Sequence, residues 1–277
     1  MNTPFVTTDW LAQHLSDPNL IVLDGSWHMP SAGRDPHAEY LAGHIPGAVF
    51  FDIDAIADTT TDLPHMLPAP NDFARMAGAL GIAENMTVVI YDEIGLFSAP
   101  RVWWTLKTMG ATDIRLLEGG GPKWRAEHRP IEAGPVNRQP RTFRTSFDAA
   151  RVVDFETVRD RSRDHAAQIA DARAAGRFSG EVPEPRAGLR GGHIPGSVNV
   201  PVGTLTVDGK LRPVAELQAL FAEQQLDLDK PIITSCGSGL TAASLALALE
   251  LSGAKQVAVY DGSWTEWGGH KDAEVEK

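Results

Sequence analysis

The chain has 277 residues, of which 43% are hydrophobic and 22% are charged, as in a globular protein that can bury one large core or two ordinary ones. Its net charge of −11 argues against a general nucleic-acid-binding protein, because such proteins need a basic face to neutralise phosphates. The single cysteine, Cys236, excludes an internal disulfide framework and a multi-cysteine metal cluster.

The N-terminus and the longest apolar runs bear on where the protein acts. The first residues lack the basic segment followed by an apolar one that marks a signal peptide. No apolar run approaches the ~20 residues that a membrane-spanning helix needs. We therefore expect a cytoplasmic protein that binds neither a membrane nor nucleic acid.

In chain order, the first half alternates short apolar runs with helical stretches. A helix is predicted over residues 71–80, with Asn71 as a good N-cap and Gly81 beyond its end. The tetrad His44-Ile-Pro-Gly47 stands between two of the apolar runs. Alternating strands and helices are typical of an α/β unit with a mainly parallel sheet. Residues 21–24 are a strand-like run and 48–51 a second apolar run, and residues 87–92 and 116–120 have matching segments in the second half.

Four landmarks of the first half recur in the second half, between 143 and 149 residues further on. This near-constant spacing predicts two homologous domains, residues 1–130 and 149–277, each of normal domain size. Residues 131–148 are rich in proline and arginine and have little apolar periodicity, so they are predicted to be an extended linker. The matched pairs are His44 with His193, Asp24 with Asp171, Asp92 with Cys236, and Trp124 with Trp267.

The second half also alternates strands and helices. Residues 214–224 are the counterpart of the helix at 71–80. Residues 245–251 alternate like a strand, but Ala, Leu and Glu are strong helix formers and Gly253 is a natural stop, so a helix is predicted over 239–252. Sites in open parallel sheets lie at the carboxyl ends of strands, and Cys236 falls at such an end.

The loop that begins at Cys236 is suited to a thiolate. Two glycines and two hydroxyl residues follow the cysteine, directly before and at the start of the predicted helix. Such a loop can turn several backbone N–H groups and a helix N-terminus toward one point, which stabilises an anion. The alternative is a buried structural cysteine, because a free cysteine is often a small core residue. The loop and the internal repeat favour the functional interpretation.

These motifs resemble the rhodanese superfamily, and within it the enzymes that take sulfur from 3-mercaptopyruvate. The resemblance covers essentially the whole chain, with Leu240 where valine is usual. It implies two tandem rhodanese-like domains, each a mainly parallel sheet flanked by helices, with the nucleophile only in the second. The first domain has Asp92 at that position and is expected to be inactive. The matching segments are the two His-Ile-Pro-Gly tetrads, Asp171-Ala-Arg173, Gly176-Arg177-Phe178, Pro183-Glu-Pro-Arg186, Cys236-Gly-Ser-Gly-Leu-Thr-Ala242 and Asp261-Gly-Ser-Trp264.

The resemblance implies a reaction without a cofactor or a metal. Cys236 would take the sulfur of 3-mercaptopyruvate as a persulfide and release pyruvate. Cyanide, a small thiol or thioredoxin would then remove the outer sulfur. Arg177 and Arg186 would hold the substrate, because a guanidinium can grip a carboxylate with two hydrogen bonds, and Ser238 would offer a proton. The remaining expected binding residues are Gly237, Gly239, Leu240 and Thr241.

Two first-domain residues, Asp35 and His44, could by resemblance form a relay toward Ser238. The competing interpretation is structural, because the same tetrad recurs at His193, where it would only brace a turn.

Three other functions are alternatives to this one. Thiosulfate sulfurtransferase is the nearest, but thiosulfate-preferring relatives carry an Arg-Lys pair after the cysteine, where this chain has Gly237 and Ser238. A non-enzymatic sulfur-carrier module is a second. A cysteine phosphatase is a third, but it would need an arginine six residues after the nucleophile, where the chain has Ala242.

Overall fold

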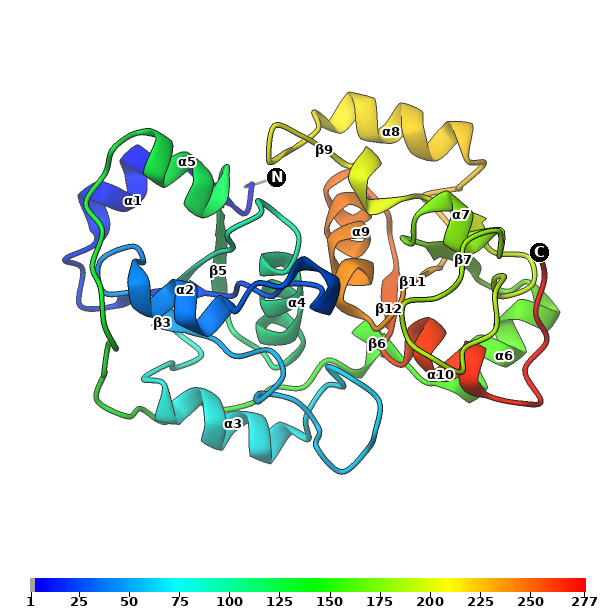
Figure 1. Cartoon of the computed structure of the whole chain (residues 1–277), viewed down its shortest axis with the longest axis horizontal. Helices are drawn as coiled ribbons and strands as arrows, with labels where there is room; N and C mark the ends of the chain where they lie inside the picture. The colour runs from blue at the N-terminus through cyan, green and yellow to red at the C-terminus, as the bar shows by residue number, and fades with distance from the viewer. Residues whose placement is uncertain (1–2) are drawn as a thin grey trace. The chain divides into compact units, whose positions relative to one another are not determined.

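The computed structural model describes residues 3–277, and these form two compact units (Figure 1). The first unit contains the residues up to Thr59, Leu67–Asp148 and Asp208–Lys210. The second contains Thr60–Met66, Ala149–Val207 and Leu211–Lys277. Each unit has its own five-stranded parallel sheet with helices packed around it, which confirms the predicted fold class. We keep the domain limits 1–130 and 149–277 as a proposal.

The first unit is built on a sheet of short strands whose central members are buried. Its strands are β1 (Phe5–Val6), β2 (Leu20–Asp24), β3 (Val49–Phe50), β4 (Thr87–Tyr91) and β5 (Asp113–Leu117). Its helices are α1 (Thr8–His14), η1 (Pro30–Ala32), α2 (Pro36–Ala42), α3 (Pro70–Ala79), α4 (Ala99–Thr108) and α5 (Gly120–Ala126). The strand order is β1-β5-β4-β2-β3, with every neighbouring pair parallel.

The second unit repeats this arrangement strand for strand. Its strands are β6 (Val152–Val153), β7 (Gln168–Asp171), β8 (Val198–Asn199), β11 (Ile232–Ser235) and β12 (Val257–Tyr260), in the order β6-β12-β11-β7-β8. Its helices are η2 (Ala149–Arg151), α6 (Phe155–Asp164), α7 (Ala175–Phe178), η3 (Val202–Thr204), α8 (Val214–Glu223), α9 (Leu240–Leu251) and α10 (Ser263–Gly269). The chain also forms the strand pair β9 (Thr206–Val207) and β10 (Lys210–Leu211).

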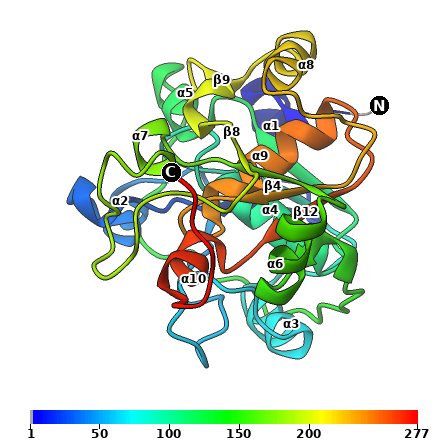
Figure 2. The same ribbon diagram turned by 90° about the vertical axis from the view of Figure 1, so that its right-hand side faces the viewer.

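Helix α9 is the centre of the second unit. Its residues from Ala242 to Leu249 are buried, and it packs on β11 and β12 (Figures 1 and 2). The ambiguous stretch at 245–251 is thus a helix, as predicted. A helix that is apolar on all sides has no polar face, so its sequence lacks the 3.6-residue hydrophobic period and can be mistaken for that of a strand.

The two His-Ile-Pro-Gly tetrads make the same backbone contacts in their own units. His44 exchanges two backbone hydrogen bonds with Glu132, at 2.8 and 2.9 Å. His193 exchanges two with Glu276, at 2.8 and 3.0 Å. In both tetrads the glycine N–H then donates to the side chain of that glutamate. Each tetrad therefore pairs with the segment that follows the last helix of its own repeat, α5 or α10.

Residues 131–148, predicted to be a linker, contain no helix or strand but are anchored to the first unit. The Phe143 ring packs edge-on against Phe73 at 5.2 Å. The Arg141 N–H donates to Gly78 O, and a Cβ at Gly78 would lie only 2.4 Å from Arg141 O. This segment therefore packs as part of the first unit over most of its length.

One predicted detail is wrong. Helix α3 begins at Pro70, with Ala69 as its N-cap, so Asn71 lies inside the first turn. Proline is favoured at the first helical position because its missing N–H would have no partner there.

No helix among residues 3–277 has both the length and the apolar character that a membrane-spanning segment needs.

Candidate active site

Cys236 lies directly after β11, the central strand of the second sheet, at its carboxyl end. Helix α9 starts at Leu240, so the loop between strand and helix is short. Gly239 closes this loop with φ +77°, a left-handed conformation that favours glycine. The cysteine is 2% exposed. The position is the one at which parallel α/β sheets carry their sites.

The start of helix α10 holds the Cys236 loop by its backbone. The Cys236 N–H donates to Ser263 Oγ at 3.1 Å. The Trp264 N–H donates to Cys236 O at 2.9 Å. Gly237 O accepts twice from Thr265, from the N–H at 2.9 Å and from the hydroxyl at 2.6 Å. The carbonyl groups at the front of the loop therefore point toward α10.

Four further N–H groups, in this loop and at the start of α9, are unengaged among the residues that the structure describes. Among residues 3–277, the amides of Gly237, Ser238, Leu240 and Thr241 have no hydrogen-bond acceptor. Within the same part of the chain, Sγ of Cys236 accepts no hydrogen bond either. The predicted donors are thus present, but they are not bonded to the thiol sulfur. They are available for an anion that sits beyond it.

The first unit shows what such a loop does when an anion is built into it. Asp92 follows β4 as Cys236 follows β11, and it is 1% exposed. Its carboxylate accepts five backbone hydrogen bonds, at 2.5–3.0 Å. The donors are Ile94, Gly95, Phe97, Ser98 and Ala99. This loop is filled by its own side chain.

Arg177 lies against the Cys236 loop. A Cβ added at Gly237 would come within 3.0 Å of Arg177 Nη2. Glu184 orients the guanidinium, accepting from Nη2 at 2.5 Å and from Nε at 3.2 Å. Among the residues that the structure describes, Nη1 has no acceptor. The Arg177 side chain is 21% exposed, so this nitrogen is available to a ligand.

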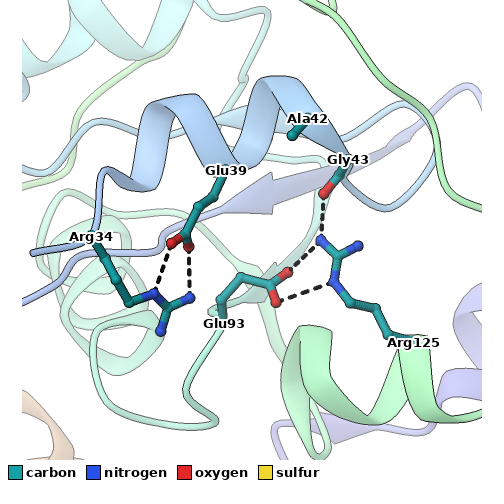
Figure 3. A pocket seen from close by; sticks show the side chains of 6 residues that line it. All are labelled: Arg34, Glu39, Ala42, Gly43, Glu93 and Arg125. Carbon is teal, nitrogen blue, oxygen red and sulfur yellow. Dashed lines mark hydrogen bonds and ion pairs between the residues drawn. The ribbon is translucent and has the colours of Figure 1, made fainter. Parts of the chain in front are cut away.

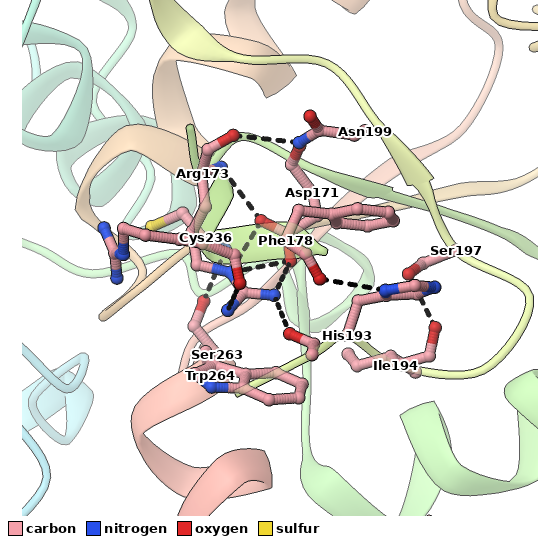
Figure 4. A network of polar contacts seen from close by, with 12 residues as sticks. Asp171, Arg173, Phe178, His193, Ile194, Ser197, Asn199, Cys236, Ser263 and Trp264 are labelled. Atoms are coloured by element: carbon pink, nitrogen blue, oxygen red, sulfur yellow. Dashed lines mark hydrogen bonds and ion pairs between the residues drawn. The ribbon is translucent and has the colours of Figure 1, made fainter. Parts of the chain in front are cut away.

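Behind Arg177 lies a fully buried arginine, Arg173, which shares the Glu184 carboxylate. Arg173 donates to Glu184 at 2.8 Å and to Asp171, at the end of β7, at 2.7 Å. Its guanidinium also stacks over the Trp264 ring, 4.2 Å from the centroid. Figure 4 shows Arg173 between Asp171 and Trp264, with Cys236 and Ser263 beside them. The two carboxylates and two guanidinium groups balance in charge, which makes their burial tolerable.

Glu184 lies within the motif Pro183-Glu-Pro-Arg186, but the sequence alone assigns it no role. A signal is present, because Glu184 is an acidic residue between two prolines, and four arginines lie between residues 172 and 191. Arg186 lies two residues beyond it and is partly buried. Its part in binding the substrate stays a prediction.

The first unit has no arginine at the position equivalent to Arg173. Ser26 stands there, and its N–H donates to Asp24, the counterpart of Asp171, at 3.0 Å. Burial without a guanidinium partner raises the pKa of Asp24 to about 6, although hydrogen bonds from Ser26 and Tyr91 oppose this shift.

Asp35 and His44 make contacts that are local to the first unit. Asp35 is the N-cap of α2 and accepts from two backbone N–H groups there. His44 is completely buried, with Nδ1 2.8 Å from Tyr40 O and its ring stacked on Tyr40 at 4.1 Å. His193 repeats this with Phe178, at 3.0 Å and 3.8 Å. Within the described chain, His44 Nε2 has no partner. The relay stays a prediction.

A pocket of about 300 Å³ in the first unit is lined by paired charges (Figure 3). Arg34 binds Glu39 through two hydrogen bonds, which lower the pKa of that carboxyl. Arg125 binds Glu93 and the Gly43 carbonyl. Glu39 directly precedes Tyr40 as Arg177 precedes Phe178, so the first unit has a carboxylate where the second has its accessible arginine. The lining residues are Arg34, Glu39, Ala42, Gly43, Glu93 and Arg125.

Comparison with known proteins shows the family of the chain. The rhodanese-like domain family matches residues 7–127 and 154–270. The chain belongs to the rhodanese family. It is 46% identical to the 3-mercaptopyruvate sulfurtransferase of Escherichia coli (strain K12), over 99% of this chain and 98% of that protein. It is 42% identical to the thiosulfate sulfurtransferase of Rattus norvegicus, over 95% of this chain and 91% of that protein.

A solved structure supports the same assignment. The crystal structure of SseA from Escherichia coli, described as a 3-mercaptopyruvate sulfotransferase with the rhodanese fold, matches with a TM-score of 0.88 at 45% identity. The match covers 95% of this chain and 99% of that chain. The similarity to these relatives shows that the chain is a sulfurtransferase enzyme. Among residues 3–277 no group of three or more His, Cys, Asp or Glu side chains could hold a metal ion.

Proposed function

We propose that this sulfurtransferase takes the sulfur of 3-mercaptopyruvate onto Cys236 as a persulfide and passes it to a thiophilic acceptor. The observation that carries the proposal is the pair of equivalent loops. The loop after Asp92 binds a built-in carboxylate, whereas the loop after Cys236 presents unengaged N–H groups. A loop that binds an anion in one unit is suited to bind a sulfur anion in the other.

In the first half-reaction, the Cys236 thiolate attacks the substrate sulfur and the carbon–sulfur bond breaks. The electron pair of that bond goes to the pyruvate enolate, which takes up a proton to become pyruvate. The substrate's own thiol proton balances this uptake, so the enzyme is left with an anionic persulfide. The outer sulfur of that persulfide is the anion that the amides of Gly237, Ser238, Leu240 and Thr241 would stabilise.

Three side chains are proposed to handle the rest of the substrate. Arg177 would bind its carboxylate or keto oxygen through Nη1, with Arg186 as the second guanidinium. Ser238, which is buried in the loop, would offer its hydroxyl proton to the departing enolate. The relay from Asp35 and His44 to Ser238 remains a prediction from the family resemblance.

In the second half-reaction, an acceptor attacks the outer sulfur and restores the thiolate. The chain has no second cysteine that could resolve the persulfide, so the acceptor is another molecule. A small thiol or thioredoxin is the proposed cellular acceptor, and cyanide serves as a test acceptor. Two separate half-reactions predict ping-pong kinetics. A cytoplasmic location remains a prediction from the sequence.

The choice of donor rests on the space beside Gly237. Its missing side chain lets the Arg177 guanidinium lie against the loop. A large basic residue at this position, as in thiosulfate-preferring enzymes, would have to displace Arg177. The structure thus favours a donor with a carboxylate for Arg177 over thiosulfate, which stays the alternative.

Steady-state kinetics with both donors test the proposal. The value of kcat/KM for 3-mercaptopyruvate should exceed that for thiosulfate at least tenfold, and Cys236→Ser should abolish both activities while leaving the unfolding midpoint nearly unchanged. A higher kcat/KM for thiosulfate would reverse the choice of donor. A wild-type protein that binds sulfur but never turns over would instead be the non-enzymatic carrier.

A further inference from the structure

We propose that Thr265, in the first turn of α10, is a positioning residue for sulfur transfer that acts through the Gly237 carbonyl. The inference rests on the proposed function. Thr265 is partly exposed and does not belong to the Cys236 loop. It nevertheless makes two hydrogen bonds to one carbonyl oxygen of that loop, from its N–H and from its hydroxyl.

The planarity of the peptide bond turns this contact into an orienting force. In a trans peptide, the carbonyl of Gly237 and the N–H of Ser238 share one plane and point in opposite directions. While Thr265 holds the carbonyl, the Ser238 N–H must point away from α10. This is one of the amides that has no acceptor among residues 3–277. Thr265 therefore aims a donor that the persulfide would use.

The loop needs such a constraint because a glycine, Gly237, stands directly before this peptide. Glycine allows backbone conformations that other residues disfavour, so a rotation of the peptide between Gly237 and Ser238 meets less steric resistance than it would after another residue. A rotated peptide would replace the N–H donor by a carbonyl oxygen. That oxygen would repel an anionic sulfur. Two bonds to the carbonyl disfavour the rotated form more strongly than one.

The first unit provides an internal comparison. There the Gly121 N–H donates to Asp92 O at 3.0 Å, as Trp264 does to Cys236 O at 2.9 Å. The residue that follows is Pro122, at the position of Thr265, and proline has neither an N–H nor a hydroxyl to donate. In that unit the Asp92 carboxylate itself orders the loop amides. The two Thr265 donors thus occur in the unit whose loop must orient its amides without a built-in anion.

The test compares Thr265→Val with Thr265→Ser and with a control, Thr204→Val. Valine keeps the shape and the backbone N–H of Thr265 but removes the hydroxyl, and serine retains the hydroxyl. Thr204 makes the same kind of bond, from its hydroxyl to Pro201 O at 2.7 Å, outside the Cys236 loop. The measurement is the single-turnover rate of persulfide formation with 3-mercaptopyruvate, together with KM and the unfolding midpoint.

We expect Thr265→Val to lower the single-turnover rate roughly tenfold, with KM within about twofold of wild type, because one preorganised donor is misaligned. Thr265→Ser should recover most of the rate, and Thr204→Val should leave it unchanged at a similar unfolding midpoint. A wild-type rate in Thr265→Val, or an equal loss in Thr204→Val, would overturn the proposal. A wild-type protein that forms no persulfide would instead refute the proposed function itself.

Discussion

Asp92 and Cys236 occupy the same place in the two sheets, each directly after the central strand. Only in the loop after Asp92, within the described chain, do the backbone N–H groups donate to the side chain at that position. Five N–H groups converge on the Asp92 carboxylate, whereas among residues 3–277 the amides of Gly237, Ser238, Leu240 and Thr241 have no acceptor. The duplicated chain thus contains a structural version and a proposed catalytic version of one anion-binding loop.

Asp92→Asn should destabilise the first unit without changing sulfur transfer. The NH₂ group of asparagine would face backbone N–H groups and could not accept the hydrogen bonds that a carboxylate oxygen now accepts. We therefore expect a loss of roughly 2–4 kcal/mol in the free energy of unfolding. Urea denaturation measures it. Asp72→Asn is the control, because the Asp72 carboxylate is exposed. A stability equal to that of the control would mean that the five hydrogen bonds contribute little.

Asp24 should make the stability of the protein depend on pH. Burial raises the pKa of Asp24 from 3.8 to about 6, so between these values the folded protein binds more protons than the unfolded chain. This contribution to stability is fully present below pH 3.8 and is lost as the pH rises through about 6. Asp24→Asn removes this ionisation. The free energy of unfolding of the variant minus that of wild type should therefore increase by roughly 3 kcal/mol from pH 3.5 to pH 8.

Urea denaturation of wild type and Asp24→Asn across this pH range provides the measurement. The difference between the two proteins matters, because it cancels the titration of other groups. A constant difference across the range would show that Asp24 ionises as readily in the folded protein as in the unfolded chain.

Glu184→Gln should impair both substrate binding and stability. Arg173 would keep a buried charge with one carboxylate fewer, which costs about 3 kcal/mol, and Arg177 would lose the partner that holds it beside the loop. We expect kcat/KM for 3-mercaptopyruvate to fall at least tenfold, mainly through KM. Glu181→Gln changes an exposed glutamate of the same loop and serves as the control. Unchanged kinetics in Glu184→Gln would remove Arg177 from the proposed binding site.

Gly237→Ala should separate the packing of Arg177 from the chemistry of Cys236. The added methyl group would lie 3.0 Å from Arg177 Nη2, so the guanidinium must shift by a few tenths of an ångström. We expect KM for 3-mercaptopyruvate to rise several-fold, with a smaller change in kcat. Gly203→Ala is the matched control, since a Cβ there meets nothing within 4 Å. Equal KM values in the two variants would contradict the proposed contact.

The internal repeat and the position of Cys236 could be predicted because both depend on local patterns. Apolar runs marked the long strands, and the spacing of His44 and His193 aligned the halves. The two-residue edge strands β1 and β6 were not predicted, since they are too short to show a period.

The supporting network around the site was beyond sequence reasoning for a different reason. Glu184 binds Arg173 and Arg177 because a loop folds over a buried guanidinium, which is a long-range outcome that no local pattern encodes. The sequence predicts that the Asp92 carboxylate cannot carry sulfur as a thiolate can, but its five hydrogen bonds depend on the path of the backbone. The same holds for Thr265, which reaches Gly237 from another helix.

Intact-protein mass spectrometry tests the central claim most directly. Wild-type protein mixed with 3-mercaptopyruvate should gain one sulfur atom, about 32 Da, and should lose it when cyanide is added. Cys236→Ala should gain nothing under the same conditions. No mass gain in the wild type, or an equal gain in Cys236→Ala, would contradict a persulfide on Cys236.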